Sequence, residues 1–362
     1  MSFVLDRIGL SIGNDVVIDD VSLSLEDGST NVLLGPTLAG KTTLMRLMAG
    51  LDRPTRGRVL ARGVDITDLP VRRRSVAMVY QQFVNYPTLT VYENIASPLR
   101  VARISRSEVD ARVKEAARLL RLDALLQRMP AQLSGGQQQR TAIARALVKR
   151  ADLVLLDEPL ANLDYKLREE LRDELPRLFA QTGAVMVYAT TEPTEALLLG
   201  GSVATLSEGR LTQFGPTANV YRNPANIASA RVFSDPPLNE LPLRKTGSRI
   251  AIENGRELPA TGAFSRLPDG RYRLGFRAEA VALGGSGSSS LVFPGLVAVT
   301  EISGSESFVH VDVGFAVWVA LSAGVHDWPP GTEVDVRVDP DLAFIFDAAG
   351  KISAPPALAK TG

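Results

Sequence analysis

The pattern that most constrains the fold of this chain is a short apolar run followed at once by a glycine-rich loop. The run Asn31–Leu34 is typical of a buried strand, and the residues after it match G-x-x-x-x-G-K-[ST] in full. In such a loop, backbone N–H groups surround a phosphate chain at the start of a helix. The pattern therefore predicts a nucleotide-binding α/β domain. The expected phosphate-binding residues are Gly35, Pro36, Thr37, Leu38, Ala39, Gly40, Lys41, Thr42 and Thr43.

Two side chains of this loop have distinct expected roles. The Lys41 ammonium would neutralise the β- and γ-phosphates, and the Thr42 hydroxyl would bind Mg²⁺. The alternative is an ordinary glycine-rich turn before a helix. In a chain of 362 residues, a chance match to this motif is on the order of one in a hundred at average glycine usage. Nucleotide binding is therefore the favoured interpretation.

A second apolar run ends in two carboxylates. Leu153–Leu156 predicts a buried strand, with Asp157 and Glu158 directly after it. Asp157 would contribute to the Mg²⁺ site, and Glu158 would act as the general base that polarises the attacking water. A strand that simply ends in solvated acidic residues is the alternative. The phosphate loop upstream favours the catalytic interpretation.

Composition limits the classes of protein to which this chain belongs. The 362 residues favour two or three domains, and 40 basic residues balance 40 acidic ones. A net charge of zero provides no general electrostatic attraction to nucleic acid, so no nucleic-acid partner is expected. The absence of cysteine from the sequence fits a reducing compartment. With neither a signal peptide at the N-terminus nor a long apolar run, any membrane role is expected to act through partners.

The pattern of elements divides the chain in two. Strands alternate with helices through about residue 210, and the Ser105 region predicts a capped helix, as expected of an α/β domain on a largely parallel sheet. Asp235–Pro237 and Leu241–Pro242 indicate a linker, after which short alternating strands predict a small barrel. We expect an ATP-binding domain at residues 1–233, with a helical part at about 88–150, and an all-β domain at 234–362.

Between the two halves of the predicted site lies the sequence Leu133–Arg140. Its residues Ser134, Gly135, Gly136 and Gln137 would present a hydroxyl and bare N–H groups at a helix N-terminus. This stretch resembles the signature motif of ATP-binding cassette (ABC) proteins. The resemblance implies that these four residues bind the γ-phosphate of an ATP held by another subunit, in a head-to-tail dimer. A plain Gly-Gly turn is the alternative.

Further segments resemble those of the same family in order and spacing. Val79–Gln81 resembles the glutamine loop, which implies that Gln81 contacts Mg²⁺ and the attacking water. Phe83–Pro87 would line a groove for a permease helix. Leu160–Asp164 resembles the loop through which the two sites communicate, with Asp164 at the subunit interface.

The resemblance continues past the cassette. Phe214–Pro216 and Leu274–Glu279 are similar to importers of the maltose and sugar-phosphate type. The resemblance implies a RecA-like domain with a helical subdomain and a C-terminal OB-like (TOBE) barrel. It also implies two integral membrane permease subunits, an extracytoplasmic solute-binding protein, and a peripheral location at the cytoplasmic face of the bacterial inner membrane. Tyr188–Pro193 resembles one cassette of the two-cassette glycerol importers.

Two positions depart from the family pattern. Thr191 aligns with the switch histidine that donates a hydrogen bond to the γ-phosphate, and the place of the adenine-stacking aromatic falls near Ile12. Both changes affect the half-site that this chain supplies, whereas the Ser134–Gln137 half-site is intact. This pattern predicts a heterodimer with an unlike ATPase subunit. The alternatives are a regulatory cassette with little hydrolysis, or an importer of another solute class such as a sugar phosphate, polyamine or anion.

Overall fold

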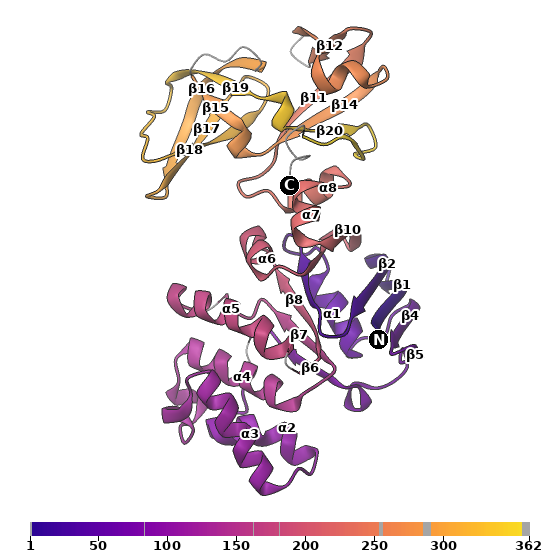
Figure 1. Cartoon of the computed structure of the whole chain (residues 1–362), viewed down its shortest axis with the longest axis vertical. Helices are drawn as coiled ribbons and strands as arrows, with labels where there is room; N and C mark the ends of the chain where they lie inside the picture. The colour runs from indigo at the N-terminus through magenta and orange to yellow at the C-terminus, as the bar shows by residue number, and fades with distance from the viewer. Residues whose placement is uncertain are drawn as a thin grey trace. The chain divides into compact units, whose positions relative to one another are not determined.

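The chain forms two compact units that divide between Ala218 and Asn219 (Figure 1). This computed structural model describes residues 2–82, 84–161, 163–180, 182–252, 256–284 and 291–356. The sequence predicts a boundary at 233–234, and the difference concerns two short helices, α7 (Thr217–Arg222) and α8 (Ile227–Val232). At the start of α8, the Ile227 N–H donates to the carbonyl of Gly350, a residue of the C-terminal unit. Phe83, Asn162, the glycine-serine stretch at 285–290 and the last residues of the chain lie outside the described residues.

A six-stranded sheet forms the centre of the N-terminal unit, with strand order β10-β9-β3-β8-β7-β6. All neighbours in it pair in parallel except β9 and β10. Strands β3, β7 and β8 are almost entirely buried, as expected of parallel strands that are covered on both faces. The strands are β3 (Thr30–Leu34), β6 (Val76–Val79), β7 (Leu153–Asp157), β8 (Val185–Thr190), β9 (Ser202–Ser207) and β10 (Arg210–Pro216).

A smaller antiparallel sheet completes the core of this unit. Its order is β2-β1-β4-β5, and helix α1 (Lys41–Ala49) lies between it and the central sheet, in one continuous apolar cluster. Helix α1 ends at Gly50, whose φ is +74°. The buried Arg74 guanidinium donates to the carbonyls of Leu47 and Met48 at this end of the helix. The strands are β1 (Ser2–Ile12), β2 (Asp15–Glu26), β4 (Arg56–Ala61) and β5 (Val64–Asp65).

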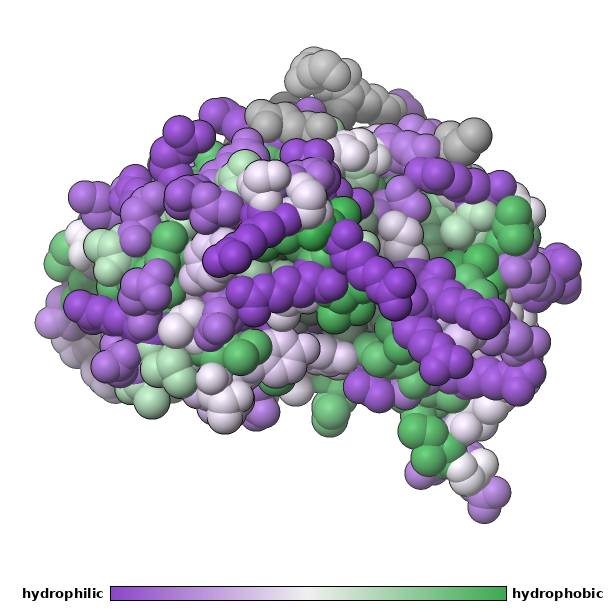
Figure 2. Space-filling view, turned by 90° about the horizontal axis from the view of Figure 1, so that it is seen from below, coloured by the Kyte–Doolittle hydropathy of each residue, from purple (hydrophilic) through white to green (hydrophobic). Residues whose placement is uncertain are grey.

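The remaining helices of the N-terminal unit include the predicted helical subdomain. Ser105 caps α3 as the sequence predicts, and Thr90 and Glu93 form a capping box at the start of α2. Figure 2 shows that the face seen from below is largely hydrophilic, with hydrophobic side chains in scattered groups between long polar ones. None of the described helices is long and apolar enough to cross a membrane. The helices are α2 (Val91–Val101), α3 (Arg106–Leu119), α4 (Gly135–Lys149), α5 (Tyr165–Ala180) and α6 (Pro193–Leu199).

The C-terminal unit contains two antiparallel sheets. One has the order β13-β12-β11-β14-β20-β21, and the other is a five-stranded, barrel-like sheet with the order β15-β19-β16-β17-β18. Trp318 is fully buried, and its indole ring packs edge-on against Phe276 and Phe293. The strands are β11 (Asn239–Thr246), β12 (Arg249–Ile252), β13 (Glu257–Pro259), β14 (Gly270–Phe276), β15 (Val281–Leu283), β16 (Leu291–Ile302), β17 (Glu306–Asp312), β18 (Val317–Ala323), β19 (Glu333–Val338), β20 (Phe344–Asp347) and β21 (Ile352–Ala354). The predicted fold class, an α/β unit followed by an all-β barrel-like unit, is confirmed.

One part of the predicted linker is wrong. Leu241–Pro242 lies inside β11, where Pro242 pairs with Arg273 of β14. Proline cannot donate a ladder hydrogen bond, so it suggests a break in a strand. On its other side, β11 pairs with β12 only from Leu243 onward. Pro242 therefore occupies a position where the strand has one neighbour and its missing N–H is tolerated.

Candidate nucleotide site

The glycine-rich loop joins β3 to α1 in a conformation that requires glycine at two positions. Gly40 has φ +97°, in the region where a side chain is strained. A Cβ at Gly35 would lie 2.4 Å from the Leu206 carbonyl oxygen, so only glycine allows this approach to β9. Leu38 also has a positive φ of 67° and is 94% exposed, an unusual position for a large apolar residue. Pro36 and Thr37 are exposed, Ala39 is buried and Thr43 is half-buried in α1.

Lys41 is buried, and its ammonium group is directed into the loop. Its Nζ donates to the carbonyls of Gly35 and Pro36 at 2.8 and 3.0 Å, and it lies 3.9 Å from a Glu158 carboxylate oxygen. Burial lowers the pKa of Lys41, while the Glu158 and Asp157 carboxylates oppose that shift. The loop thus holds a positive charge close to the backbone that a phosphate would contact.

Thr42 and Asp157 meet across 115 residues of sequence. The Thr42 hydroxyl donates to Asp157 Oδ2 at 2.8 Å, at the carboxyl end of β7. Burial raises the pKa of Asp157, and the Thr42 hydrogen bond and the Lys41 charge act in the opposite direction. A hydroxyl and a carboxylate are the hard oxygen donors that Mg²⁺ prefers, and Mg²⁺ usually takes only one or two protein carboxylates beside the phosphates. The residues therefore fit this ion.

Gln81 and Glu158 form the other contact at this edge of the sheet. Gln81 Nε2 donates to Glu158 Oε2 at 2.7 Å, and the Glu158 N–H donates to the Ala189 carbonyl at 3.0 Å. Glu158 has φ +45°, which is costly for a residue with a side chain and common at functional sites. The structure thus gathers Lys41, Thr42 and Gln81 around the two carboxylates at the carboxyl end of β7, Asp157 and Glu158.

The predicted signature residues lie at the start of α4. Ser134 and Gln137 form a capping box in which each side chain accepts a hydrogen bond from the other's backbone N–H. A Cβ at Gly136 would lie 2.9 Å from Leu163 Cδ2, so the bare glycines allow close approach of the loop that leads to the exposed Asp164. No hydrogen bond or ion pair joins Ser134–Gln137 to the phosphate loop within the described residues.

Thr191 follows β8 directly beside the phosphate loop. The N–H of Gly35 donates to the carbonyl of the preceding Thr190 at 3.4 Å, and Thr191 itself is exposed. Its side chain forms no hydrogen bond with the described residues. Ile12, at the end of β1, is 64% exposed. An aliphatic side chain therefore stands at the place where an adenine-stacking ring is expected.

A buried polar cluster next to Thr191 is not predicted by the sequence. The hydroxyls of Tyr188 and Thr190 donate to one oxygen of Glu195, at 3.2 and 2.6 Å. Burial raises the pKa of Glu195, the two hydrogen bonds oppose the shift, and the nearby Glu192 adds to it. The sequence Thr-Glu-Pro-Thr-Glu at 191–195 is typical of the exposed N-terminus of a helix. The only local signal for the cluster is the pairing of a buried-strand tyrosine with a glutamate seven residues later.

Comparisons with known proteins agree with this arrangement. Residues 18–161 match the ABC transporter family. The trehalose/maltose import ATP-binding protein MalK of Thermococcus litoralis is 36% identical, over 92% of this chain and 94% of that protein. The sn-glycerol-3-phosphate import ATP-binding protein UgpC of Escherichia coli is 36% identical, over 82% of this chain and 84% of that protein. The lactose transport ATP-binding protein LacK of Rhizobium radiobacter is 35% identical, over 96% of this chain and 98% of that protein.

A solved structure is similar to part of the chain. It is a dimeric ATP-binding cassette in a post-hydrolysis state with ADP and Pi, 30% identical, with a TM-score of 0.55. The match covers 59% of this chain and 98% of the solved cassette. The fold, the site and these relatives together define an ABC-type ATPase. The chain belongs to the ABC transporter family of ATP-binding proteins.

Proposed function

We propose that this protein is the ATP-hydrolysing subunit of a bacterial importer for a carbohydrate or polyol, at the cytoplasmic face of the inner membrane. The relatives named above are import ATP-binding proteins for maltose or trehalose, lactose and sn-glycerol-3-phosphate. The single observation that carries the proposal is the convergence of Lys41, Thr42 and Gln81 on the Asp157–Glu158 pair.

In this proposal each residue of the cluster has a separate task. The Lys41 ammonium exchanges the two loop carbonyls for the β- and γ-phosphates of ATP. Thr42, Asp157 and Gln81 would hold Mg²⁺, which would neutralise phosphate charge. Glu158 accepts a proton from the attacking water. In this structure Gln81 donates a hydrogen bond to one Glu158 oxygen. That bond must break for the same oxygen to accept a hydrogen bond from the attacking water.

Replacing Glu158 tests the proposal. We expect Glu158→Gln to lower ATP hydrolysis by about a hundredfold or more, because general bases contribute roughly 10²–10⁴-fold, and to leave ATP binding intact. The measurements are phosphate release and equilibrium ATP binding. The matched control is Glu192→Gln, which changes an exposed carboxylate that faces Arg168. Equal loss of hydrolysis in both variants, or no loss in Glu158→Gln, would contradict the assignment.

A groove in the N-terminal unit supports a permease partner. It has a volume of about 940 Å³, and its lining includes Tyr86, Val101 and Arg145. Val101 is 86% exposed and Tyr86 is 49% exposed, so apolar surface is available to a partner helix. The Arg145 guanidinium lies over the Tyr86 ring, and Asn85 donates to the Gln138 carbonyl at 2.9 Å. Helix α4, which begins at the signature residues, is therefore attached to the groove wall.

The proposed assembly has two such permease subunits and, through them, an extracytoplasmic solute-binding protein. Two ATPase subunits form the head-to-tail dimer in which Ser134, Gly135, Gly136, Gln137 and Asp164 contact the neighbouring ATP. Thr191 and Ile12 support an unlike second ATPase subunit, since both weaken the half-site that this chain supplies. The resemblance of Tyr188–Pro193 favours glycerol as the solute.

The second candidate is an ATP-binding regulatory subunit with little hydrolysis of its own. The exposed Thr191 favours it, because this side chain is too short to replace an imidazole without a bridging water. The intact Glu158 favours hydrolysis. An importer of a sugar phosphate, polyamine or anion is the remaining alternative. Solute uptake by the assembled importer, measured against a panel that includes glycerol, distinguishes these solutes.

A further inference from the structure

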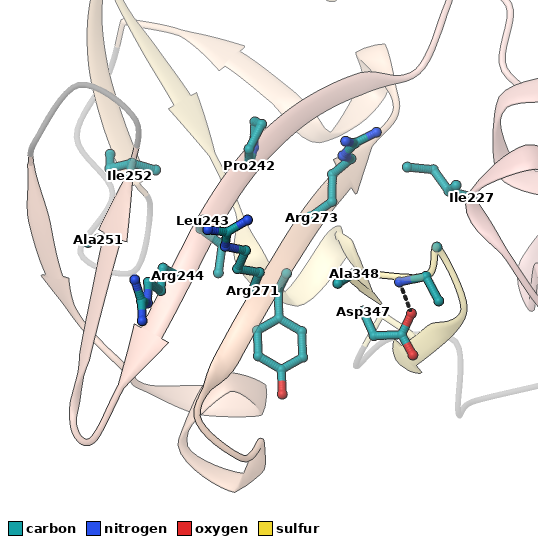
Figure 3. Close-up of a pocket in the computed structure, with 13 residues that line it drawn as sticks. Ile227, Pro242, Leu243, Arg244, Ala251, Ile252, Arg271, Arg273, Asp347 and Ala348 are labelled. Carbon is teal, nitrogen blue, oxygen red and sulfur yellow. Dashed lines mark hydrogen bonds between the residues drawn. The ribbon is translucent and has the colours of Figure 1, made fainter.

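A groove on one face of the C-terminal unit is lined by three arginines. It has a volume of about 630 Å³, within the usual range for small-molecule sites. Arg244 comes from β11, and Arg271 and Arg273 come from the adjacent β14 (Figure 3). Apolar side chains, including Ile227 and Pro242, form other parts of the wall. The groove therefore combines positive charge with apolar surface.

The register of the two strands places two of these charges directly opposite each other. Arg244 pairs with Arg271 in the β11–β14 ladder, and both side chains are exposed. Like charges at directly opposed positions are destabilising in a sheet. Neither guanidinium forms an ion pair or hydrogen bond with the described residues. Within the part of the chain that the structure describes, the fold thus keeps this pair of cations without a compensating charge.

Two of the described residues near the groove are carboxylates that already accept hydrogen bonds. Glu240 accepts from both Arg231 and Arg273, so the third arginine shares an ion-pair partner with Arg231. Asp347 is the acidic residue among the described lining residues, and its Oδ1 accepts the N–H groups of Ala349 and Lys351 in the β20–β21 turn. These bonds hold its carboxylate at the turn. Among the described lining residues, Arg244 and Arg271 are therefore the cations without an ion-pair partner.

We propose that this groove binds a phosphate dianion, as a small organic phosphate whose apolar or hydroxylated body lies against the groove wall. Two guanidinium groups match the two charges of a phosphate monoester, and their planar N–H forks suit its oxygens. The apolar wall provides contact that inorganic phosphate cannot use. The inference concerns residues of the C-terminal unit only and does not depend on the proposed ATPase role.

The test is calorimetric titration of the full chain with its nucleotide site saturated by a non-hydrolysable MgATP analogue, so that the phosphate loop and the position of the γ-phosphate are both occupied. The probes are glucose 6-phosphate, inorganic phosphate and glucose, each to about 10 mM, which covers millimolar dissociation constants. We expect glucose 6-phosphate to bind, inorganic phosphate to bind more weakly, and glucose not to bind. Equal affinity for both phosphates would still support the phosphate site and would identify free phosphate as the ligand.

Substitutions locate the binding. Arg244→Gln and Arg271→Gln should each weaken it by about tenfold or more, because each removes charge-assisted hydrogen bonds. The matched control is Arg249→Gln, in the same sheet but paired with Glu257 and outside the groove lining. Both groove variants should also unfold at a higher temperature than the parent at low salt, since each relieves the like-charge pair, which shows that they are folded. No phosphate binding, or binding that survives both groove substitutions, would overturn the proposal.

Discussion

At the residue scale, the carboxylate of Glu195 stabilises the segment that carries Thr191. Both of its hydrogen-bond donors, Tyr188 and Thr190, belong to β8, and the Thr190 hydroxyl also accepts the N–H of Glu192. The cluster fixes the backbone on both sides of Thr191, and the Thr191 side chain itself forms no hydrogen bond with the described residues. Thr191 is therefore presented from a rigid support beside the phosphate loop.

The burial of Glu195 predicts a pH dependence of stability. Its folded pKa is raised above the ordinary value of 4.5, so between these two pKa values the folded chain binds more protons than the unfolded chain. The free energy of unfolding should therefore fall as pH rises through that window. Burial is the largest cause of the raised pKa, and the hydrogen bonds from Thr190 and Tyr188 reduce the shift more than the Arg168 charge does. Glu195→Gln keeps an acceptor for both hydroxyls and should reduce this slope. Thermal unfolding across pH measures it.

A matched control for this experiment is Glu208→Gln, which changes an exposed carboxylate in the turn between β9 and β10. It should keep the slope of the parent protein. If Glu195→Gln and the parent have identical pH profiles, the Glu195 carboxyl does not contribute as described.

At the element scale, helix α4 connects the predicted signature to the rest of the site. Its cap is Ser134, and its first turn approaches Leu163 at the bare Gly136. Further along the helix, Gln139 donates to the Pro159 carbonyl, which follows Glu158. The sequence predicts the start of this helix because Ser-Gly-Gly-Gln is a local capping pattern. It does not predict the attachment to Pro159, since a glutamine in a helix is normally exposed.

Replacing Ser134, the cap of α4, tests separately the structural role of this residue and its proposed role at the neighbouring ATP. Ser134→Ala should lower the free energy of unfolding by about 1 kcal/mol, and it should also abolish ATP-dependent dimerisation. Ser105→Ala is the matched control, because Ser105 caps α3 in the same way. The control should lose similar stability and keep ATP-dependent association. Sedimentation with ATP and the co-expressed partner ATPase subunit, and denaturant unfolding of the chain alone, make the two measurements. Loss of association in both variants would show that the effect is structural.

At the scale of the whole molecule, the two units use their sheets differently. In the N-terminal unit, parallel strands place Asp157 and Thr190 at one edge, where the phosphate loop begins. In the C-terminal unit, antiparallel strands present the arginine groove on one face. ATP chemistry and the proposed phosphate groove are thus assigned to different units of the same chain.

The proposed unlike partner is tested at this scale. If Thr191 weakens its half-site, Thr191→His should raise the ATPase rate of the purified protein by roughly tenfold to a hundredfold, because a hydrogen bond to a charged group contributes roughly 1.5–3 kcal/mol. The control is Thr194→His, at an exposed position of α6. Brisk hydrolysis by the unaltered protein as a homodimer, unchanged by Thr191→His, would contradict the heterodimer.

The sequence alone determines the parts of this protein that depend on neighbouring residues. The strand, loop and helix around Lys41, the strand ending at Asp157, the Ser105 cap and the change to short strands after Phe233 are all local patterns, and the structure contains each of them. Short-range propensity and periodicity are properties of the chain itself, so they are readable before folding.

Only the tertiary structure decides which distant residues meet. The Thr42–Asp157 and Gln81–Glu158 contacts span 115 and 77 residues, and the Arg244–Arg271 pair depends on strand register. Burial of Glu195 and acceptance of Pro242 within β11 likewise depend on which elements pack beside them. Strand order and register follow from packing of the whole core, and a one-residue shift would reverse every side chain. For this physical reason, the arginine groove is a property of the fold and not of any single segment.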